Sequence, residues 1–308
     1  MKPFNNIAVI DIGSNTIRLL IGKVEGDRVK RIYVDRKVAR LGTEISKNKK
    51  LNEKSIEKSL GILRKFKEVS EQFLSEPVIA VGTSALREAV NSQDFIEMVK
   101  KELGLNIRII SGNEEAFFTL EGIKSGLDDR INQLFALDIG GGSTEWIYSD
   151  NDGILMGSLN LGALKEYEKF FKTDPPLQEE IENLRNYIHS IVGGTFLSIV
   201  REKIFVTGGT AVTLAMMALK LDSYIPEKLH LTKVSLEEVN NIIEKLRLTP
   251  LNERKKIIGL IKDRVDIILP GLMILESVAK HICANNIIVS DYGFIEGIMK
   301  NYKYFCYN

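Results

Sequence analysis

The sequence contains very little cysteine and histidine, and this scarcity excludes several classes of protein. Of 308 residues, two are cysteine, Cys283 and Cys306, and three are histidine. Two cysteines are too few for a disulfide framework and lack the paired spacing of a zinc site, so a reducing cytoplasm fits best. The histidines are isolated, which excludes hydrolases that hold zinc with two histidines on one helix.

The chain also lacks an excess of charge and long apolar runs. The 42 basic and 41 acidic side chains leave a formal charge of +1, so no overall field would attract DNA or an anionic membrane. No apolar run approaches the roughly 20 residues that span a bilayer, and Asp11 interrupts the first run. We therefore expect neither a membrane segment nor a signal peptide. The P-loop motif and the Gly-x-Ser-x-Gly nucleophile motif are absent too.

What the chain does contain is a repeated pattern of strand, turn and strand. A β-branched run at residues 7–10 is followed by a polar turn and a second apolar segment at 17–24. The same plan returns in the second half, with apolar residues 134–137, a Gly-rich turn and residues 145–148. Both copies predict hairpins with polar tips, and their similarity indicates an internal repeat.

Further strands alternate with helices along both halves. An amphipathic pattern predicts a helix over residues 52–73, and helices are also predicted near 177–200 and 235–246. Such alternation favours an α/β fold, and the chain is long enough for two domains. We predict domains at 1–125 and 126–308, with a hinge in the polar segment 126–130. The final helix, after Asp291, is expected to pack against the first domain.

Each copy of the repeat has an aspartate at its head, glycine in its turn and a hydroxyl residue at its tail. Glycine lets backbone N–H groups approach an anion closely because no Cβ intervenes. One such turn is usually structural, but two related turns favour the binding of a phosphate chain. A third Gly turn follows the strand at 204–207, where a plain strand-to-helix turn is an equal alternative. The predicted phosphate-binding residues are Gly13, Ser14, Asn15, Thr16, Gly140, Gly141, Gly142, Ser143, Thr144, Gly208 and Gly209.

A buried carboxylate at a strand end costs free energy unless a cation compensates it. Mg²⁺ prefers carboxylate and phosphate oxygens and keeps several waters. Asp138 and Glu145 are therefore predicted to hold Mg²⁺ against a substrate phosphate, with Asp11 as a further ligand and Mn²⁺ as an alternative ion. The structural alternatives are a turn cap for Asp138 and an ordinary exposed strand residue for Glu145.

Over nearly its whole length the chain resembles the exopolyphosphatase and guanosine pentaphosphate phosphatase (Ppx/GppA phosphatase) family of the actin-like ATPase superfamily. The resemblance implies two ribonuclease H-like lobes around an interdomain cleft. It also implies Mg²⁺-dependent release of terminal orthophosphate from polyphosphate or guanosine pentaphosphate, and a homodimer is compatible with it. The motifs that carry it are Asp11 to Thr16, Thr83 to Ala89, Ser111 to Ala116, Asp138 to Glu145, Pro270 to Leu272, and Ser290 with Asp291.

The resemblance implies that Glu115 is the general base and that Glu114 is only its neighbour. Without the family, two glutamates at a helix start would be explained by the favourable helix dipole. Arg87 matches the phosphate-contacting arginine of the family, since a guanidinium grips phosphate oxygens with two parallel donors. Arg18, on the strand after the first turn, is a weaker candidate for the same contact.

The chain departs from the family pattern at Ile295, where many members carry an arginine before Glu296. It also ends at Asn308 without the long helical region of larger relatives, which favours shorter substrates. Two other functions stay open: a small-molecule kinase of the same superfamily, and a sensor that binds polyphosphate or the nucleotide without hydrolysis. Glu115 favours water as the acceptor, whereas the sequence does not rank the two substrates.

Overall fold

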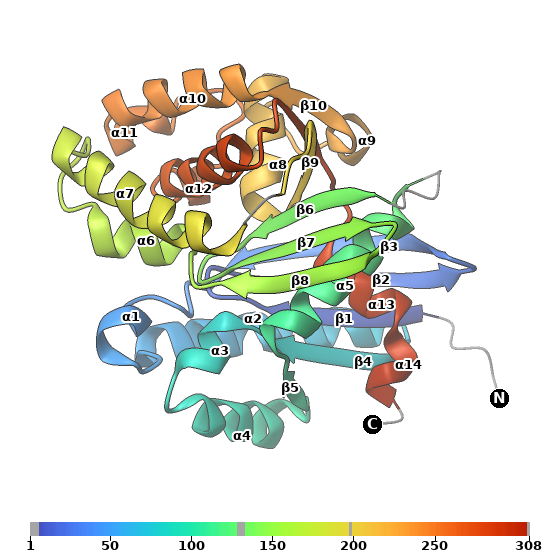
Figure 1. Ribbon diagram of the computed structural model, residues 1–308. Helices are drawn as coiled ribbons and strands as arrows, with labels where there is room; N and C mark the ends of the chain where they lie inside the picture. Colours follow the sequence, from blue (N-terminus) through green and yellow to red (C-terminus); the bar gives the residue numbers. More distant parts are fainter. Residues whose placement is uncertain (1–5, 128–132, 197–198, 307–308) are drawn as a thin grey trace. The chain divides into compact units, whose positions relative to one another are not determined.

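The computed structural model describes residues 6–127, 133–196 and 199–306 (Figure 1). The chain divides into two compact units. Among the described residues, the first unit contains 6–127 and 292–306, and the second contains 133–196 and 199–291. Residues 292–306 pack with the first unit, as expected for the final helix, so the second unit ends at Asp291 and not at the predicted residue 308. Residues 128–130 of the predicted hinge lie outside the described residues.

The first unit is built on a mixed sheet with the strand order β3-β2-β1-β4-β5. β1 pairs antiparallel with β2 and parallel with β4, while β2–β3 is antiparallel and β4–β5 is parallel. The strands are β1 (Asn6–Ile12), β2 (Thr16–Glu25), β3 (Arg28–Val38), β4 (Ser75–Gly82) and β5 (Ile107–Ile109).

β1 lies at the centre of this sheet because it is apolar on both faces. Ala8 and Ile10 belong to a cluster that includes side chains of α2 and α4, whereas Ile7 and Val9 belong to one with α5 and α13. The sheet is thus covered on both sides, as expected for a strand without polar alternation. The helices are α1 (Ile45–Asn48), α2 (Glu53–Gln72), α3 (Ser84–Glu88), α4 (Ser92–Leu103), α5 (Gly112–Ser125), α13 (Phe294–Lys300) and α14 (Tyr302–Cys306).

Two glycines explain why the C-terminal segment joins the first unit. A Cβ on Gly122 of α5 would lie 1.7 Å from the carbonyl oxygen of Gly293, and one on Gly297 would lie 1.7 Å from that of Phe118. The backbones of α5 and α13 therefore touch directly, which only glycine permits. Phe294 and Ile298 complete the contact by filling the apolar cluster on that face of the sheet.

The second unit has a sheet with the order β10-β11-β9-β6-β7-β8. β6 pairs antiparallel with β7 and parallel with β9, β7–β8 is antiparallel, and β9–β11 is parallel. The strands are β6 (Leu134–Ile139), β7 (Thr144–Asp150), β8 (Gly153–Leu159), β9 (Lys203–Thr207), β10 (Thr232–Ser235) and β11 (Asn286–Val289). The helical segments are α6 (Ala163–Phe170), α7 (Gln178–Thr195), α8 (Gly208–Ala218), α9 (Pro226–Leu229), α10 (Leu236–Leu248), α11 (Leu251–Arg254), η1 (Lys262–Arg264) and α12 (Ile268–His281).

The two sheets share one topology, which confirms the predicted α/β fold and its internal repeat. Strands β6, β7, β8, β9 and β11 occupy the places of β1, β2, β3, β4 and β5, and β10 is added at the edge. The third strand of each copy was not predicted from the sequence. Of the helices within the described residues, none is both long and apolar enough to cross a lipid bilayer.

Candidate active site

The two predicted phosphate turns have the same backbone geometry, each within its own unit. The Gly13 N–H donates to the Thr16 carbonyl at 3.1 Å, and the Gly140 N–H donates to the Ser143 carbonyl at 3.0 Å. A segment after the third strand supports each turn from behind: Gly42 N–H donates to Ser14 at 2.7 Å, and Ala163 N–H donates to Gly140 at 2.9 Å. Duplicated sequence thus gives duplicated local structure.

Two of the predicted side chains stabilise these turns from within. The Thr144 hydroxyl donates to the Leu161 carbonyl at 2.7 Å in the buried interior. The Asn15 side-chain amide donates to the Thr16 hydroxyl oxygen at 3.2 Å. The proton of the Thr144 hydroxyl is therefore used inside the second unit.

The aspartate at the head of each turn faces a different partner in each unit. Asp11 is directly opposite Arg18 across β1 and β2, and Arg18 Nε lies 2.7 Å from Asp11 Oδ2. Burial raises the pKa of Asp11, and the positive charge and hydrogen bond of Arg18 offset only part of that rise. Because Arg18 already supplies the compensating cation, metal binding by Asp11 stays a prediction without geometric support.

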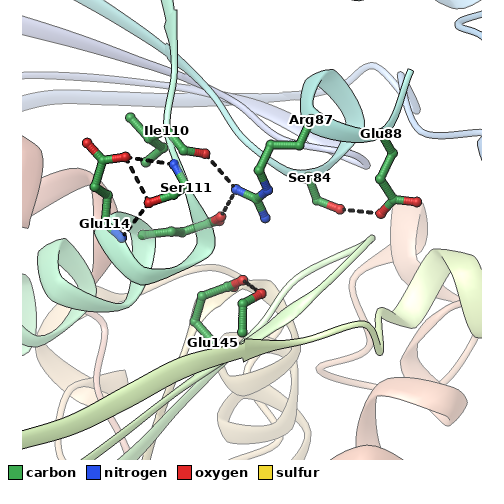
Figure 2. Close-up of polar contacts among 9 residues, drawn as sticks. Ser84, Arg87, Glu88, Ile110, Ser111, Glu114 and Glu145 are labelled. Atoms are coloured by element: carbon green, nitrogen blue, oxygen red, sulfur yellow. Dashed lines mark hydrogen bonds and ion pairs between the residues drawn. The ribbon is translucent and has the colours of Figure 1, made fainter. Parts of the chain in front are cut away.

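In the second unit the equivalent pair consists of two acids. Asp138 is directly opposite Glu145 across β6 and β7, and their exposed fractions are only 7% and 1%. The Ser158 hydroxyl on β8 donates to Glu145 Oε1 at 2.7 Å (Figure 2). Like charges opposite each other on neighbouring strands destabilise a sheet unless a cation compensates them. The donor set fits a hard divalent cation.

Within the described residues, no group of three or more acidic, histidine or cysteine side chains gathers as a metal site. Mg²⁺ does not need one, because it is commonly held by one or two carboxylates together with substrate phosphates and water. The Asp138 and Glu145 carboxylates have the chemistry of that mode of binding.

The third Gly turn lies beside the acidic pair. Gly208 has φ of +83°, and a Cβ there would be 2.2 Å from Asp138 Oδ1, so only glycine lets the carboxylate approach. A Cβ on Gly209 would meet Arg264 Nη2 at 1.8 Å. The Arg264 guanidinium therefore lies against the first turn of α8, a neighbour that sequence reasoning missed because no motif links the two positions.

In the first unit, Arg87 and Glu115 form an ion pair. Arg87 Nη1 lies 2.7 Å from Glu115 Oε2 and also donates to the Ile110 carbonyl at 3.0 Å (Figure 2). Glu115 is 8% exposed. The hydroxyl of Ser84, at the start of the helix that carries Arg87, donates to Glu88 Oε1 at 3.0 Å.

Glu114 has a different task from its neighbour. It forms a capping box at the start of α5, accepting from the Ser111 N–H at 2.8 Å and the Ser111 hydroxyl at 2.9 Å (Figure 2). Burial raises the pKa of Glu114, but hydrogen bonds from Ser111 and Tyr304 and the charge of Arg108 outweigh it and lower the pKa below 4.5. The structure thus uses Glu114 to hold the helix, while Glu115 faces the arginine.

The departure at position 295 has a structural explanation. Ile295 is 5% exposed and belongs to the apolar cluster between the sheet and α13. Glu296, on α13, forms an ion pair with a residue of β3: Arg31 Nη2 lies 2.8 Å from Glu296 Oε1. The other Glu296 oxygen accepts from the Gly293 N–H at 2.8 Å.

The chain is similar to known proteins over most of its length. The model of the Ppx/GppA phosphatase family matches residues 20–303. A bifunctional 3-dehydroquinate synthase/phosphatase of Fusobacterium nucleatum is 32% identical over 310 residues, covering 92% of this chain but only 44% of that protein. A putative exopolyphosphatase of Haemophilus influenzae is 29% identical, with coverage of 95% and 90%.

The fold is also similar to that of a solved structure. The crystal structure of the Aquifex aeolicus member of the Ppx/GppA family superposes with a TM-score of 0.82 at 28% identity. The match covers 99% of this chain and 100% of that one. The similarity therefore extends over both units and not over one motif alone.

Proposed function

Because the chain belongs to the Ppx/GppA phosphatase family, we propose that it releases terminal orthophosphate from inorganic polyphosphate or guanosine pentaphosphate. The reaction hydrolyses a phosphoanhydride bond: water oxygen bonds to the terminal phosphorus as the bond to the bridging oxygen breaks. The exopolyphosphatase named among the relatives, which this chain matches over most of its length, supports this substrate class.

The observation that carries the proposal is the ion pair between Arg87 and Glu115 at 2.7 Å. In the proposed mechanism the Arg87 guanidinium binds the phosphate, and the neighbouring Glu115 carboxylate orients and deprotonates water. A phosphate arriving at Arg87 would compete with Glu115 for the guanidinium, because Arg binds phosphate with parallel donors. Glu115 would then accept the proton of the attacking water, with Glu114 retained in the helix cap.

The second unit supplies a site for a divalent cation through Asp138 and Glu145, and backbone N–H groups through its Gly turn. Mg²⁺ or Mn²⁺, when bound, would neutralise phosphate charge and favour departure of the bridging oxygen. Within each unit, the N–H groups of the Gly turn that are not already donated inside the turn, as those of Gly13 and Gly140 are, would bind non-bridging phosphate oxygens. Positioning and charge stabilisation of this kind are the main means of catalysing phosphoryl transfer.

One experiment tests the proposal directly. Phosphate release is measured with tripolyphosphate, long-chain polyphosphate, guanosine pentaphosphate and ATP, each with Mg²⁺, with Mn²⁺ and with a chelator. We expect metal-dependent release from polyphosphate, guanosine pentaphosphate or both. Transfer from ATP to an added small-molecule acceptor would instead indicate a kinase. Binding without any phosphate release would indicate a sensor, and either result would overturn the proposal.

A further inference from the structure

The first turn of α5 is held from outside the helix by α14. The Tyr304 hydroxyl donates to Glu114 Oε1 at 3.0 Å. Arg108, at the middle of β5, donates from Nη2 to the Tyr304 hydroxyl at 2.7 Å and lies 3.4 Å from the same Glu114 oxygen. Groups from β5 and α14, far apart in sequence, thus converge on one carboxylate oxygen of α5.

Aromatic packing fixes the direction of the Tyr304 hydroxyl. The Arg108 guanidinium carbon lies 4.4 Å from the Tyr304 ring centroid. Phe118, one helical turn after Glu114, has its ring centroid 5.9 Å from that of Tyr304, and Phe305 lies at 5.2 Å in an edge-to-face arrangement. Such contacts orient a ring beyond what its buried area alone does.

The other oxygen of Glu114 is held by the helix itself. Glu114 Oε2 accepts from both the backbone and the hydroxyl of Ser111, and the Glu115 N–H donates to the Ser111 carbonyl at 3.0 Å. The carboxylate of Glu114 therefore links the start of α5 to Tyr304. Because Glu115 is the next residue, the same turn sets its backbone position.

We propose that Tyr304 is a positioning residue for phosphoanhydride hydrolysis: through Glu114, its hydroxyl fixes the first turn of α5 and thereby the direction of the Glu115 carboxylate. The inference rests on the proposed function, because it needs Glu115 as the base. A general base must lie within hydrogen-bond reach of the water it activates, and small displacements lower the rate steeply.

The test variant is Tyr304→Phe, which keeps the ring and its aromatic contacts and removes only the hydroxyl, which donates to Glu114 and accepts from Arg108. We expect kcat to fall about 3- to 10-fold, less than the roughly 100-fold cost of a 1 Å misplacement. KM should stay within about twofold, since substrate binding is not changed. Tyr33→Phe is the matched control, because Tyr33 packs against Phe73 on the opposite face of the same sheet and should keep wild-type kcat.

Two further readouts separate positioning from a loss of stability. Glu114 is faced by Arg108 from β5, Tyr304 from α14 and Ser111 from its own cap. Without the Tyr304 donor, Glu114 should take up a proton at higher pH. The acid limb of the pH profile of kcat should therefore move to higher pH. In a Glu114→Gln background, Tyr304→Phe should lower kcat by less than it does alone, because both changes remove the same link.

The outcomes distinguish this inference from the function on which it rests. Wild-type protein without phosphate release would remove the proposed function. Active wild type with an unchanged kcat in Tyr304→Phe would overturn the inference alone. A lower kcat with an unmoved acid limb and additive effects in the double variant would also overturn it, since that pattern indicates general destabilisation.

Discussion

Arg18 and Glu145 occupy equivalent positions in the two units, each directly opposite the aspartate near the end of the first strand of its sheet. Arg18 balances the charge of Asp11, whereas Glu145 adds to that of Asp138. The next strand continues the difference, with Arg36 opposite Arg18 and Ser158 opposite Glu145. The duplicated hairpin has therefore diverged in charge: the strands beside the aspartate carry two arginines in the first copy and a glutamate and a serine in the second.

The contact between Ser158 and the acidic pair predicts that removing the Ser158 hydroxyl raises the Mg²⁺ concentration needed for activity. Ser158 donates to Glu145 and fixes the carboxylate proposed to bind Mg²⁺. We expect Ser158→Ala to raise the Mg²⁺ concentration for half-maximal phosphate release about 10- to 100-fold, the usual effect of losing a group that orients a metal ligand. Ser190→Ala, on the exposed part of α7, should match the wild type. An unchanged requirement in Ser158→Ala would remove Glu145 as the ligand.

The capping glutamate predicts the pH dependence of stability. The pKa of Glu114 is lower in the folded protein than its ordinary value of 4.5. Its contribution is therefore present above pH 4.5 and is lost as the pH falls through the lowered pKa. The unfolding midpoint of wild type should exceed that of Glu114→Gln at neutral pH, and the gap should narrow below pH 4.5. A gap that stays constant down to the acid transition would contradict this assignment.

A buried arginine predicts a large loss of stability in the second unit. Arg254 is 1% exposed, and its guanidinium donates to the carbonyl oxygens of Leu246, Thr249 and Val265. Arg254→Met would leave these carbonyl oxygens without the guanidinium donor. We therefore expect the free energy of unfolding to fall by about 3 to 5 kcal/mol.

The measurement for Arg254 is urea unfolding followed by the fluorescence of Trp146, the only tryptophan, which reports on the second unit. Arg247→Met is the control, because Arg247 pairs with the exposed Glu244, and it should change stability by less than about 0.5 kcal/mol. Equal midpoints for the two variants would contradict the structural role of Arg254.

Much of the fold could be predicted because the two copies of the repeat begin with buried strands, whose apolar residues are easy to recognise. β1 and β6 are apolar on both faces, and their turns carry the same residues, so the hairpins and the two related lobes follow from the pattern. β3 was missed because it is an edge strand: of its eleven residues, five are Lys or Arg and one is Asp, which masks the alternation of apolar side chains.

The site was only partly predictable for a similar reason. The motifs identified Arg87 and Glu115, and the structure brings this pair together within the first unit. The residues that contact the acidic side chains of the site lie outside the motifs. Arg18 opposite Asp11 and Ser158 opposite Glu145 depend on strand register, and the contact of Tyr304 with Glu114 depends on a helix 190 residues away.

The most direct test is the rate of phosphate release by Glu115→Gln, measured in single turnover on the best substrate of the wild type. The account predicts a decrease of about 10²- to 10⁴-fold, the usual contribution of a positioned base, with substrate binding retained. Glu114→Gln should lose far less, because Glu114 caps the helix and is not the proposed base. A wild-type rate in Glu115→Gln would contradict the account.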